Sequence, residues 1–342
     1  MSPKKSLNPE KNKSLLPRIG ISVGDPGGIG PEVTLKAFGG RSNIPPAHYI
    51  FFGSSLVLEQ EMGALSISLD FHPYDPGFDP GKTSFSLVEI GSPLEPVRSK
   101  RLGKSGKENG LASFLYFQEA VDMARKGNLQ AVVTAPISKK SWDLAGIHWK
   151  GHTEYLARYY PQAIMAFWSG RLKIALLSHH VSLKRALNRI TRNELGEFFS
   201  VLHQSVERLQ PGRYEFLVSG LNPHAGEEGL LGNEEINEIL PAIRLARKKG
   251  LRISGPYPPD VIYRHALDKP DRIVIALYHD QGLIAFKIVA FETGVNISLG
   301  LPFIRTSPDH GTAFDIAGRG LADAGSMVEA VKLARELAPL SF

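Results

Sequence analysis

The sequence contains no cysteine among its 342 residues. A disulfide framework is therefore excluded, and so are a thiolate nucleophile and a zinc site with cysteine ligands. Any metal would have to be bound by histidine, aspartate or glutamate. The chain also lacks an apolar run that approaches the ~18 residues of a membrane span, and its first residues have no apolar signal-peptide core. We therefore expect a cytoplasmic protein with no membrane partner.

Outside its N-terminal residues, the chain carries little net charge. The formal net charge is +6, but residues 1–18 carry five cations and one acid, which leaves +2 for the other 324 residues. A polar, basic run of this kind predicts that residues 1–17 form a disordered tail, with an arm that binds nucleic acid as the alternative. The rest of the chain has no basic stripe interleaved with aromatic residues, so we expect no nucleic-acid partner.

An orthodox dinucleotide fingerprint is also missing. The predicted strand 18–23 leads into the glycine-rich turn 24–32, whose spacing is G-x-x-G-G-x-G rather than G-x-G-x-x-G. The next predicted strand, 48–52, ends in Gly-Ser-Ser instead of the acid that would bind a ribose. We predict that this turn closes a strand and helix unit without forming a Rossmann site.

The sequence does contain a clear alternation of helices and strands. Short apolar runs predict further strands at 130–134, 164–168, 172–177, 216–219 and 273–277, and helical spacing of apolar residues predicts helices at 111–126, 192–208, 234–249 and 326–337. The two strands around Gly170 are close enough to form an antiparallel hairpin. The proline-rich segment 255–259 predicts a rigid turn. This alternation favours an α/β protein with mostly parallel sheets, covered by helices on both faces.

Residues 278–318 hold the densest mixture of histidine, acid, cation and glycine in the chain. This segment predicts a strand, a turn, a short helix, a strand, a loop and a helix start. Its polar residues therefore fall at the ends of elements, where α/β proteins build sites.

Three histidines, His180, His224 and His279, each follow a different predicted strand. Because the carboxyl ends of parallel strands share one edge of a sheet, they could converge there and bind a catalytic divalent metal. The alternative is that each is a local hydrogen-bonding residue. His179 precedes His180 on an extended run and faces the opposite way, so one of the two can ligate, and the sequence does not choose between them.

Lys287, Asn296 and Arg305 stand among apolar residues, where an unpaired cation is costly. We expect an anionic partner for the two cations, which is either a carboxylate of the protein or a phosphate or carboxylate of a substrate. The segment 151–154 is a further polar turn. It predicts either a helix N-terminus with Thr153 as its cap or a part of the same site.

These segments together resemble one known family, the 4-hydroxythreonine-4-phosphate dehydrogenase (PdxA) family. The resemblance rests on seven segments in this order: 24–32, 134–139, 151–154, 220–227, 278–282, 294–296 and 300–307. It covers the chain from about residue 18 to the C-terminus. Residues 310–318 are also similar to the nucleotide loop of isopropylmalate and isocitrate dehydrogenases, whose fold the family shares. One departure is Ser182, where the family often has proline.

The resemblance implies two α/β/α domains with the active site in the cleft between them. Residues 18–140 plus 302–342 would form the cofactor domain, and residues 141–301 would carry the metal, substrate and dimer contacts. It also implies a homodimer with shared active sites.

The resemblance further implies a role for individual residues. One divalent ion (zinc, magnesium or cobalt) would be bound by His180, His224 and His279, with His279 from the other subunit. The phosphorylated amino-acid substrate would be bound by His152, Thr153, Lys287, Asn296 and Arg305. The cofactor, NAD or NADP, would lie along His310, Gly311, Thr312, Ala313 and Asp315. The catalytic candidates are Asp260, Asp280 and Lys287, of which the two acids are candidates for proton transfer.

The implied reaction is NAD-dependent oxidation of 4-phosphooxy-L-threonine at C3, followed by decarboxylation to 3-amino-2-oxopropyl phosphate, in pyridoxal 5'-phosphate biosynthesis. Three alternatives stay open from the sequence. They are a paralogous 4-phospho-threonate or erythronate dehydrogenase, a metal-dependent hydrolase, and a binding module for a phosphorylated ligand.

Overall fold

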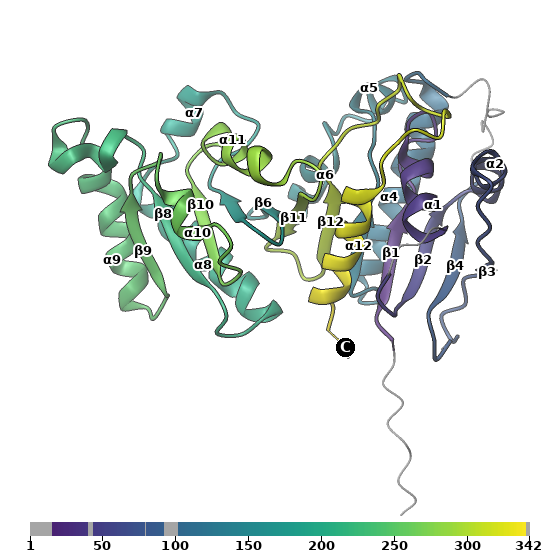
Figure 1. Cartoon of the computed structure of the whole chain (residues 1–342), viewed down its shortest axis with the longest axis horizontal. Coiled ribbons are helices and arrows are strands. Elements are labelled where there is room, and N and C mark those ends of the chain that lie inside the picture. The colour runs from purple at the N-terminus through teal and green to yellow at the C-terminus, as the bar shows by residue number, and fades with distance from the viewer. Residues whose placement is uncertain (1–15, 40–43, 79, 92–101, 340–342) are drawn as a thin grey trace, which may run out of the picture.

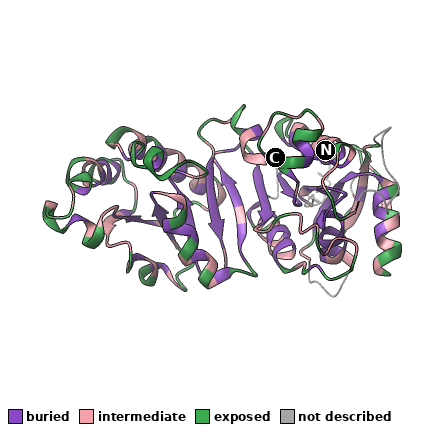
Figure 2. Ribbon diagram, turned by 90° about the horizontal axis from the view of Figure 1, so that it is seen from above, coloured by how far each residue is buried: buried purple, intermediate pink, exposed green. Residues whose placement is uncertain are grey.

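The computed structural model describes residues 16–39, 44–78, 80–91 and 102–339, so residues 1–15 of the predicted tail lie outside the described part. Twelve strands of these ranges form one sheet in the order β3-β4-β2-β1-β5-β12-β11-β6-β7-β10-β8-β9. Helices cover both faces of this sheet (Figures 1 and 2). The predicted α/β class with a mostly parallel sheet is confirmed.

The sheet has two halves that meet at β11 and β12. The first half holds β1 (Arg18–Ser22), β2 (His48–Gly53), β3 (Phe71–Pro73), β4 (Ser84–Glu89), β5 (Ala131–Thr134) and β12 (Ile304–Pro308). The second half holds β6 (Ile164–Trp168), β7 (Lys173–Leu176), β8 (Glu215–Ser219), β9 (Ile253–Tyr257), β10 (Arg272–Ala276) and β11 (Val295–Leu299). Each half draws its strands from one of the two predicted domains, while the sheet itself is continuous, and the division into domains stays a prediction.

Antiparallel pairing is confined to the middle of the described sheet. β11 is antiparallel to both β12 and β6, and β6 is antiparallel to β7, which confirms the predicted hairpin. The register of β11 against β12 places Ser298 opposite Arg305 and Asn296 opposite Ser307. Residues opposite one another share a face of the sheet, and so do residues two apart on one strand. Asn296, Ser298 and Arg305 therefore lie together.

Helices join the strands and cover the sheet. They are α1 (Gly30–Gly39), α2 (Ser55–Leu65), α4 (Lys107–Arg125), α5 (Lys139–Leu144), α6 (His152–Ala157), α7 (Leu183–Leu187), α8 (Arg192–Leu209), α9 (Leu240–Lys248), α10 (Ile262–Ala266), α11 (His279–Ala290) and α12 (Gly325–Leu337), with a turn of 3-10 type at Pro223–Gly229 and a π-helical turn at Glu235–Ile239. The four helices predicted from apolar spacing are confirmed as α4, α8, α9 with its preceding π turn, and α12. Among the described residues, no helix combines the length and the apolar character that crossing a membrane requires.

Two predictions of local structure are wrong. The segment 255–259 was expected to be a turn, but its first three residues belong to β9. β9 lies at the edge of the sheet, and an edge strand tolerates proline because the missing N–H has no ladder partner there. The helix start expected near residue 318 is also absent, since residues 314–320 form turns and α12 begins at Gly325. This stretch contains Gly318 and Gly320, and glycine disfavours a helix.

Most strands are buried on both faces. All six residues of β2 are buried, and the large buried side chains include Trp142, Tyr116 and Phe117. Helices therefore shield both sides of the sheet, and polar residues become accessible where strands end. Figure 1 shows α7, α11 and the loop after β12 along one edge, at the carboxyl ends of the parallel strands.

Candidate active site

The buried cation Arg305 on β12 organises one group of polar side chains. Its Nε and Nη2 donate to Thr134 Oγ1 at 3.1 and 2.7 Å, and its Nη1 donates to Asn296 Oδ1 at 3.2 Å and Ser298 Oγ at 3.4 Å. Its Nη2 also donates to His152 Nδ1 at 3.0 Å. A guanidinium has five N–H groups, so each of them has a protein acceptor.

Arg305 is only 3% exposed, and no ion pair to a carboxylate is found for it in the described part of the chain. Burial lowers the pKa of the guanidinium to about 10, and the charge of Glu154 acts in the opposite direction. The partners that surround Arg305 are neutral. The group therefore keeps a positive charge that no protein carboxylate neutralises within hydrogen-bonding distance.

His152 is the first residue of α6 and is held in one tautomer. Its Nδ1 accepts the hydrogen bond from Arg305, so the ring proton must sit on Nε2, which has no partner among the described residues. The ring packs on Phe117 with centroids 4.3 Å apart. Burial, and then the charge of Arg305, hold the pKa of His152 well below its usual range. His152 is therefore a neutral imidazole at neutral pH.

Thr153 does not cap α6. The cap position is Gly151, which has a φ of 145° and no side chain to bond the helix, so the expectation of a Thr153 cap is wrong. Thr153 instead lines a cavity of about 480 Å³ together with Glu154 and His179. Of the five predicted substrate-binding residues, the structure thus brings His152, Asn296 and Arg305 into contact and places Thr153 beside them.

Lys287 lies on α11 and has a protein carboxylate as its partner. Its Nζ donates to Asp309 Oδ2 at 2.8 Å, in a pair whose lysine is 40% exposed. Asp309 is the first residue after β12, and its N–H donates to Ser326 Oγ at 3.1 Å. Lys287 therefore holds the start of the predicted cofactor loop, and two of its three N–H donors are left for a ligand.

The three predicted metal ligands follow neighbouring strands, because His180, His279 and His224 come after β7, β10 and β8, which are adjacent in the sheet. The rings of His180 and His279 lie 5.7 Å apart. His180 Nδ1 is also 3.8 Å from a Glu154 oxygen, and the choice of His180 over His179 stays a prediction. The described residues contain no set of three potential ligands close enough to hold a metal. The ring contact found among the three imidazoles is therefore between His180 and His279, and His224 lies on the exposed turn Pro223–Gly229.

The two acids predicted for proton transfer are both exposed. Asp260 lies in the turn after β9. Asp280 follows His279, and its Oδ1 accepts a hydrogen bond from His279 Nδ1 at 2.8 Å. Asp280 therefore fixes the orientation of that ring, as carboxylates commonly do for histidines that bind metals.

The predicted cofactor residues lie on a loop that packs against the glycine-rich turn. Ile29 N donates to Thr312 O at 3.0 Å, and a Cβ on Gly28 would lie 2.7 Å from that carbonyl oxygen. Only glycine allows this approach. Gly311 faces open space, since a Cβ there would meet nothing within 4 Å. His310 Nδ1 donates to Gly311 O at 3.2 Å.

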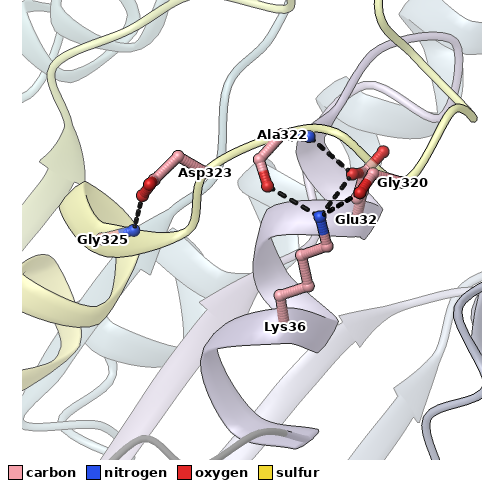
Figure 3. A network of polar contacts seen from close by, with 6 residues as sticks. All are labelled: Glu32, Lys36, Gly320, Ala322, Asp323 and Gly325. Carbon is pink, nitrogen blue, oxygen red and sulfur yellow. Dashed lines mark hydrogen bonds and ion pairs between the residues drawn. The ribbon is translucent and has the colours of Figure 1, made fainter.

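The far end of this loop is held by α1 (Figure 3). Lys36 Nζ donates to Gly320 O and Ala322 O, both at 2.8 Å, and to Glu32 Oε1 at 2.9 Å. Glu32 Oε1 in turn accepts from Ala322 N at 2.8 Å, and Glu32 is only 1% exposed. We refer to Glu32 and Lys36 as the α1 clamp. The glycine-rich turn and α1 thus support the loop from beneath, while the absence of a Rossmann site at this turn stays a prediction.

Several residues of this region escaped the sequence analysis. Thr134 and Ser298 accept hydrogen bonds from Arg305, and Glu32 and Lys36 form the α1 clamp. Thr134 and Glu32 stand within two of the segments that carry the family resemblance, which is the signal that could have drawn attention to them.

Comparisons with known proteins identify the family. A sequence model described as "Pyridoxal phosphate biosynthetic protein PdxA" matches residues 46–334. A 4-hydroxythreonine-4-phosphate dehydrogenase of Desulforapulum autotrophicum is 38% identical over 323 residues, which cover 93% of this chain and 94% of the relative. A putative D-threonate 4-phosphate dehydrogenase of Halalkalibacterium halodurans is 37% identical over 326 residues, which cover 94% of this chain and 97% of the relative.

Solved structures agree with these sequence relatives. The 4-hydroxythreonine-4-phosphate dehydrogenase of Klebsiella pneumoniae superposes with a TM-score of 0.84 at 33% identity, over 94% of this chain and 98% of that one. The similarity therefore includes both halves of the sheet and the residues at their junction. With the family match and the shared fold in agreement, the chain belongs to the PdxA family of dehydrogenases.

Proposed function

We propose that this protein oxidises the C3 hydroxyl of 4-phosphooxy-L-threonine with NAD, and that the product loses CO2 to give 3-amino-2-oxopropyl phosphate, a step of pyridoxal 5'-phosphate biosynthesis. Family membership and the Desulforapulum relative of that name support this proposal. The structural observation that carries it is Arg305, a buried cation whose protein partners are neutral. Such a group favours a ligand that brings negative charge.

Substrate binding follows from the hydrogen bonds that Arg305 makes. Since all five of its N–H groups have protein acceptors, Arg305 acts by its charge and by orienting His152 and Asn296. The donors offered to the phosphate and carboxylate are then His152 Nε2, Asn296 Nδ2, the Thr153 hydroxyl and the remaining N–H groups of Lys287. Holding the substrate between these residues aligns its C3–H bond with the nicotinamide, and alignment of this kind is worth up to about 7–11 kcal/mol.

The proposed reaction has two steps, an oxidation and a decarboxylation. The C3 hydrogen leaves with its electron pair as hydride to the nicotinamide, and the hydroxyl proton passes to a base, for which Asp280 and Asp260 are the candidates. The β-keto acid formed then breaks its C1–C2 bond. The electron pair of that bond forms an enolate between C2 and C3, which takes a proton at C2 as CO2 departs.

We also propose that His180, His224 and His279 bind one divalent ion, zinc, magnesium or cobalt, at a site completed by a second subunit. The resemblance implies that His279 comes from the other subunit, but the rings of His180 and His279 lie 5.7 Å apart within one chain, so we propose His224 for that part instead. The contact between the rings of His180 and His279, and the Asp280 bond that orients His279, support this assignment. When bound, such an ion polarises the oxygen at C3 and stabilises developing negative charge. The exposed position of His224 is compatible with a contact across subunits.

A homodimer is supported by an apolar stripe on α11. Ile284, Ile288 and Phe291 are 64, 81 and 73% exposed and lie at helical spacing on one face. Exposed apolar clusters of this kind mark interfaces. The same helix begins with His279 and carries Lys287, so a second subunit docked here would lie next to the candidate site. We infer that this face joins two copies of the chain.

The cofactor is proposed to lie along His310, Gly311, Thr312, Ala313 and Asp315. The loop is fixed at both ends, by Lys287 and by the α1 clamp, while Gly311 between them faces open space. The choice between NAD and NADP and the cytoplasmic location stay predictions.

The test is a steady-state assay of purified enzyme that follows NADH absorbance with 4-phosphooxy-L-threonine and, separately, with D-threonate 4-phosphate. Because a relative named for the second substrate is nearly as similar, the ratio of kcat/KM decides between the two. The proposal requires the first substrate to be preferred, and a preference for the second would assign the chain to the paralogous activity. Elemental analysis of His224→Ala tests the metal, because a full metal complement in that variant would refute the ligand assignment.

A further inference from the structure

A cavity away from the candidate site lies between α12 and the β6–β7 hairpin. It has a volume of about 230 Å³, and its lining includes Trp168, Lys173, Arg213, Glu329, Lys332 and Glu336. We refer to it as the α12 crevice. None of these residues contacts the groups around Arg305 or the histidines in any described hydrogen bond or ion pair.

Three cations and two carboxylates line the α12 crevice, and both carboxylates are already paired. Lys332 Nζ is 2.9 Å from Glu329 Oε1, and Arg213 Nη1 is 3.8 Å from Glu336 Oε1. Lys173 is the cation left over, because no carboxylate lies within ion-pair distance of it in the described chain. The lining therefore carries one positive charge in excess.

Lys173 is also the most buried of these cations, at 9% exposure. Its Nζ donates to Pro270 O at 2.9 Å and lies 5.7 Å from the centre of the Trp168 ring. An ammonium has three N–H donors, so two are left without a protein acceptor. Burial, and then the charge of Arg213, lower the pKa of Lys173, which means that the surroundings disfavour its charged form.

Trp168 offers a second unsatisfied donor in the same lining. It is 2% exposed, and its Nε1 has no hydrogen-bond partner among the described residues. Buried N–H donors without partners are rare, and they are expected where a ligand or water completes the bonding. A neutral donor next to an unpaired ammonium is the combination that binds an oxyanion.

From these contacts we propose that the α12 crevice is a second ligand site, which binds a small anion with a phosphate or carboxylate group through Lys173. The volume accommodates a small metabolite rather than a dinucleotide. The crevice joins α12, from the first half of the sheet, to the β6–β7 hairpin of the second half, so an anion bound there contacts both halves.

Equilibrium binding of inorganic phosphate tests the proposal, with malonate titrated in parallel to separate phosphate from carboxylate recognition. The variant is Lys173→Met, which keeps an unbranched side chain one atom shorter and removes the charge. The matched control is Lys126→Met, which removes one exposed charge at the end of α4. At constant ionic strength, Lys173→Met should bind one anion fewer per chain than the wild type and the control. Equal numbers of bound phosphate and malonate in all three proteins would overturn the proposal.

A second variant keeps the test decisive if Lys173→Met does not fold. Because Lys173 has no carboxylate partner within ion-pair distance, its replacement leaves no buried counter-charge behind, so Lys173→Met should fold. If it does not, Arg213→Gln removes a more exposed cation from the same lining and should weaken the affinity for the same anion at least several-fold. An unchanged affinity in Arg213→Gln would then refute the site.

Discussion

Replacing Lys36 with methionine should both destabilise the protein and loosen the cofactor loop. Lys36 Nζ has three acceptors, Glu32 Oε1 and the carbonyl oxygens of Gly320 and Ala322. Without it, the carboxylate of Glu32 stays buried with Ala322 N as its one described donor. The variant therefore leaves a buried charge without its counter-ion.

The loss of stability expected in Lys36→Met depends on how deeply its ion pair with Glu32 is buried. Breaking a buried ion pair by removing one partner costs about 3–5 kcal/mol. The side chain of Lys36 is 25% exposed while Glu32 is 1% exposed, so water can reach one side of the pair and we expect the lower end, about 3 kcal/mol. In the double variant Glu32→Gln, Lys36→Met no charge is stranded, and the cost should fall to about 1 kcal/mol of lost hydrogen bonding. The double variant should therefore be about 2 kcal/mol more stable than Lys36→Met.

Urea unfolding of the wild type, both variants and a control measures these energies. The control is Lys332→Met, which breaks an exposed pair with Glu329, at 41 and 39% exposure, and should change stability by less than about 1 kcal/mol. The KM for NAD should rise several-fold in Lys36→Met with little change in the KM for the phosphorylated substrate, because the α1 clamp touches only the loop. A loss of stability no larger than that of Lys332→Met would refute the buried pair.

The α/β class and the hairpin were predictable because they depend on local patterns. Apolar runs such as 130–134 and 273–277 became buried strands, and the short connection at Gly170 allows only an antiparallel turn. The edge strand β9 was missed because its prolines are typical of turns, and nothing in the local sequence states that the segment lies at the sheet edge. The order of the strands in a sheet depends on contacts between distant parts of the chain, so a local pattern cannot predict it.

The sequence predicted which residues belong to the polar site, but only some of the contacts between them. Arg305 was expected to have an anionic partner, and its actual acceptors include Thr134, which is 171 positions away in the chain. Such a contact is set by the pairing of β5 with β12, which no local pattern encodes. The strand-end argument for the histidines did place His180 next to His279. It could not place His224, because the turn that carries it adopts left-handed backbone angles that strand periodicity does not foresee.

Three further predictions concern the candidate site and the dimer. Arg305→Lys keeps the charge but cannot satisfy five acceptor contacts, so the KM for the phosphorylated substrate should rise at least tenfold in steady-state kinetics, and an unchanged KM would contradict its role in orienting His152 and Asn296. Ile288→Glu should shift the protein from dimer to monomer in light scattering, whereas Leu56→Glu, on α2, should not. His152 has a pKa lowered by burial and by Arg305, so the unfolded chain takes up this proton first as the pH falls. Stability should then decrease as the pH drops below about 6.5, the ordinary value for histidine. In His152→Gln, unfolding free energies measured at pH 7.5, 6.5 and 5.5 should depend less on pH than in the wild type, and an equal dependence would mean that His152 does not titrate as a buried neutral imidazole.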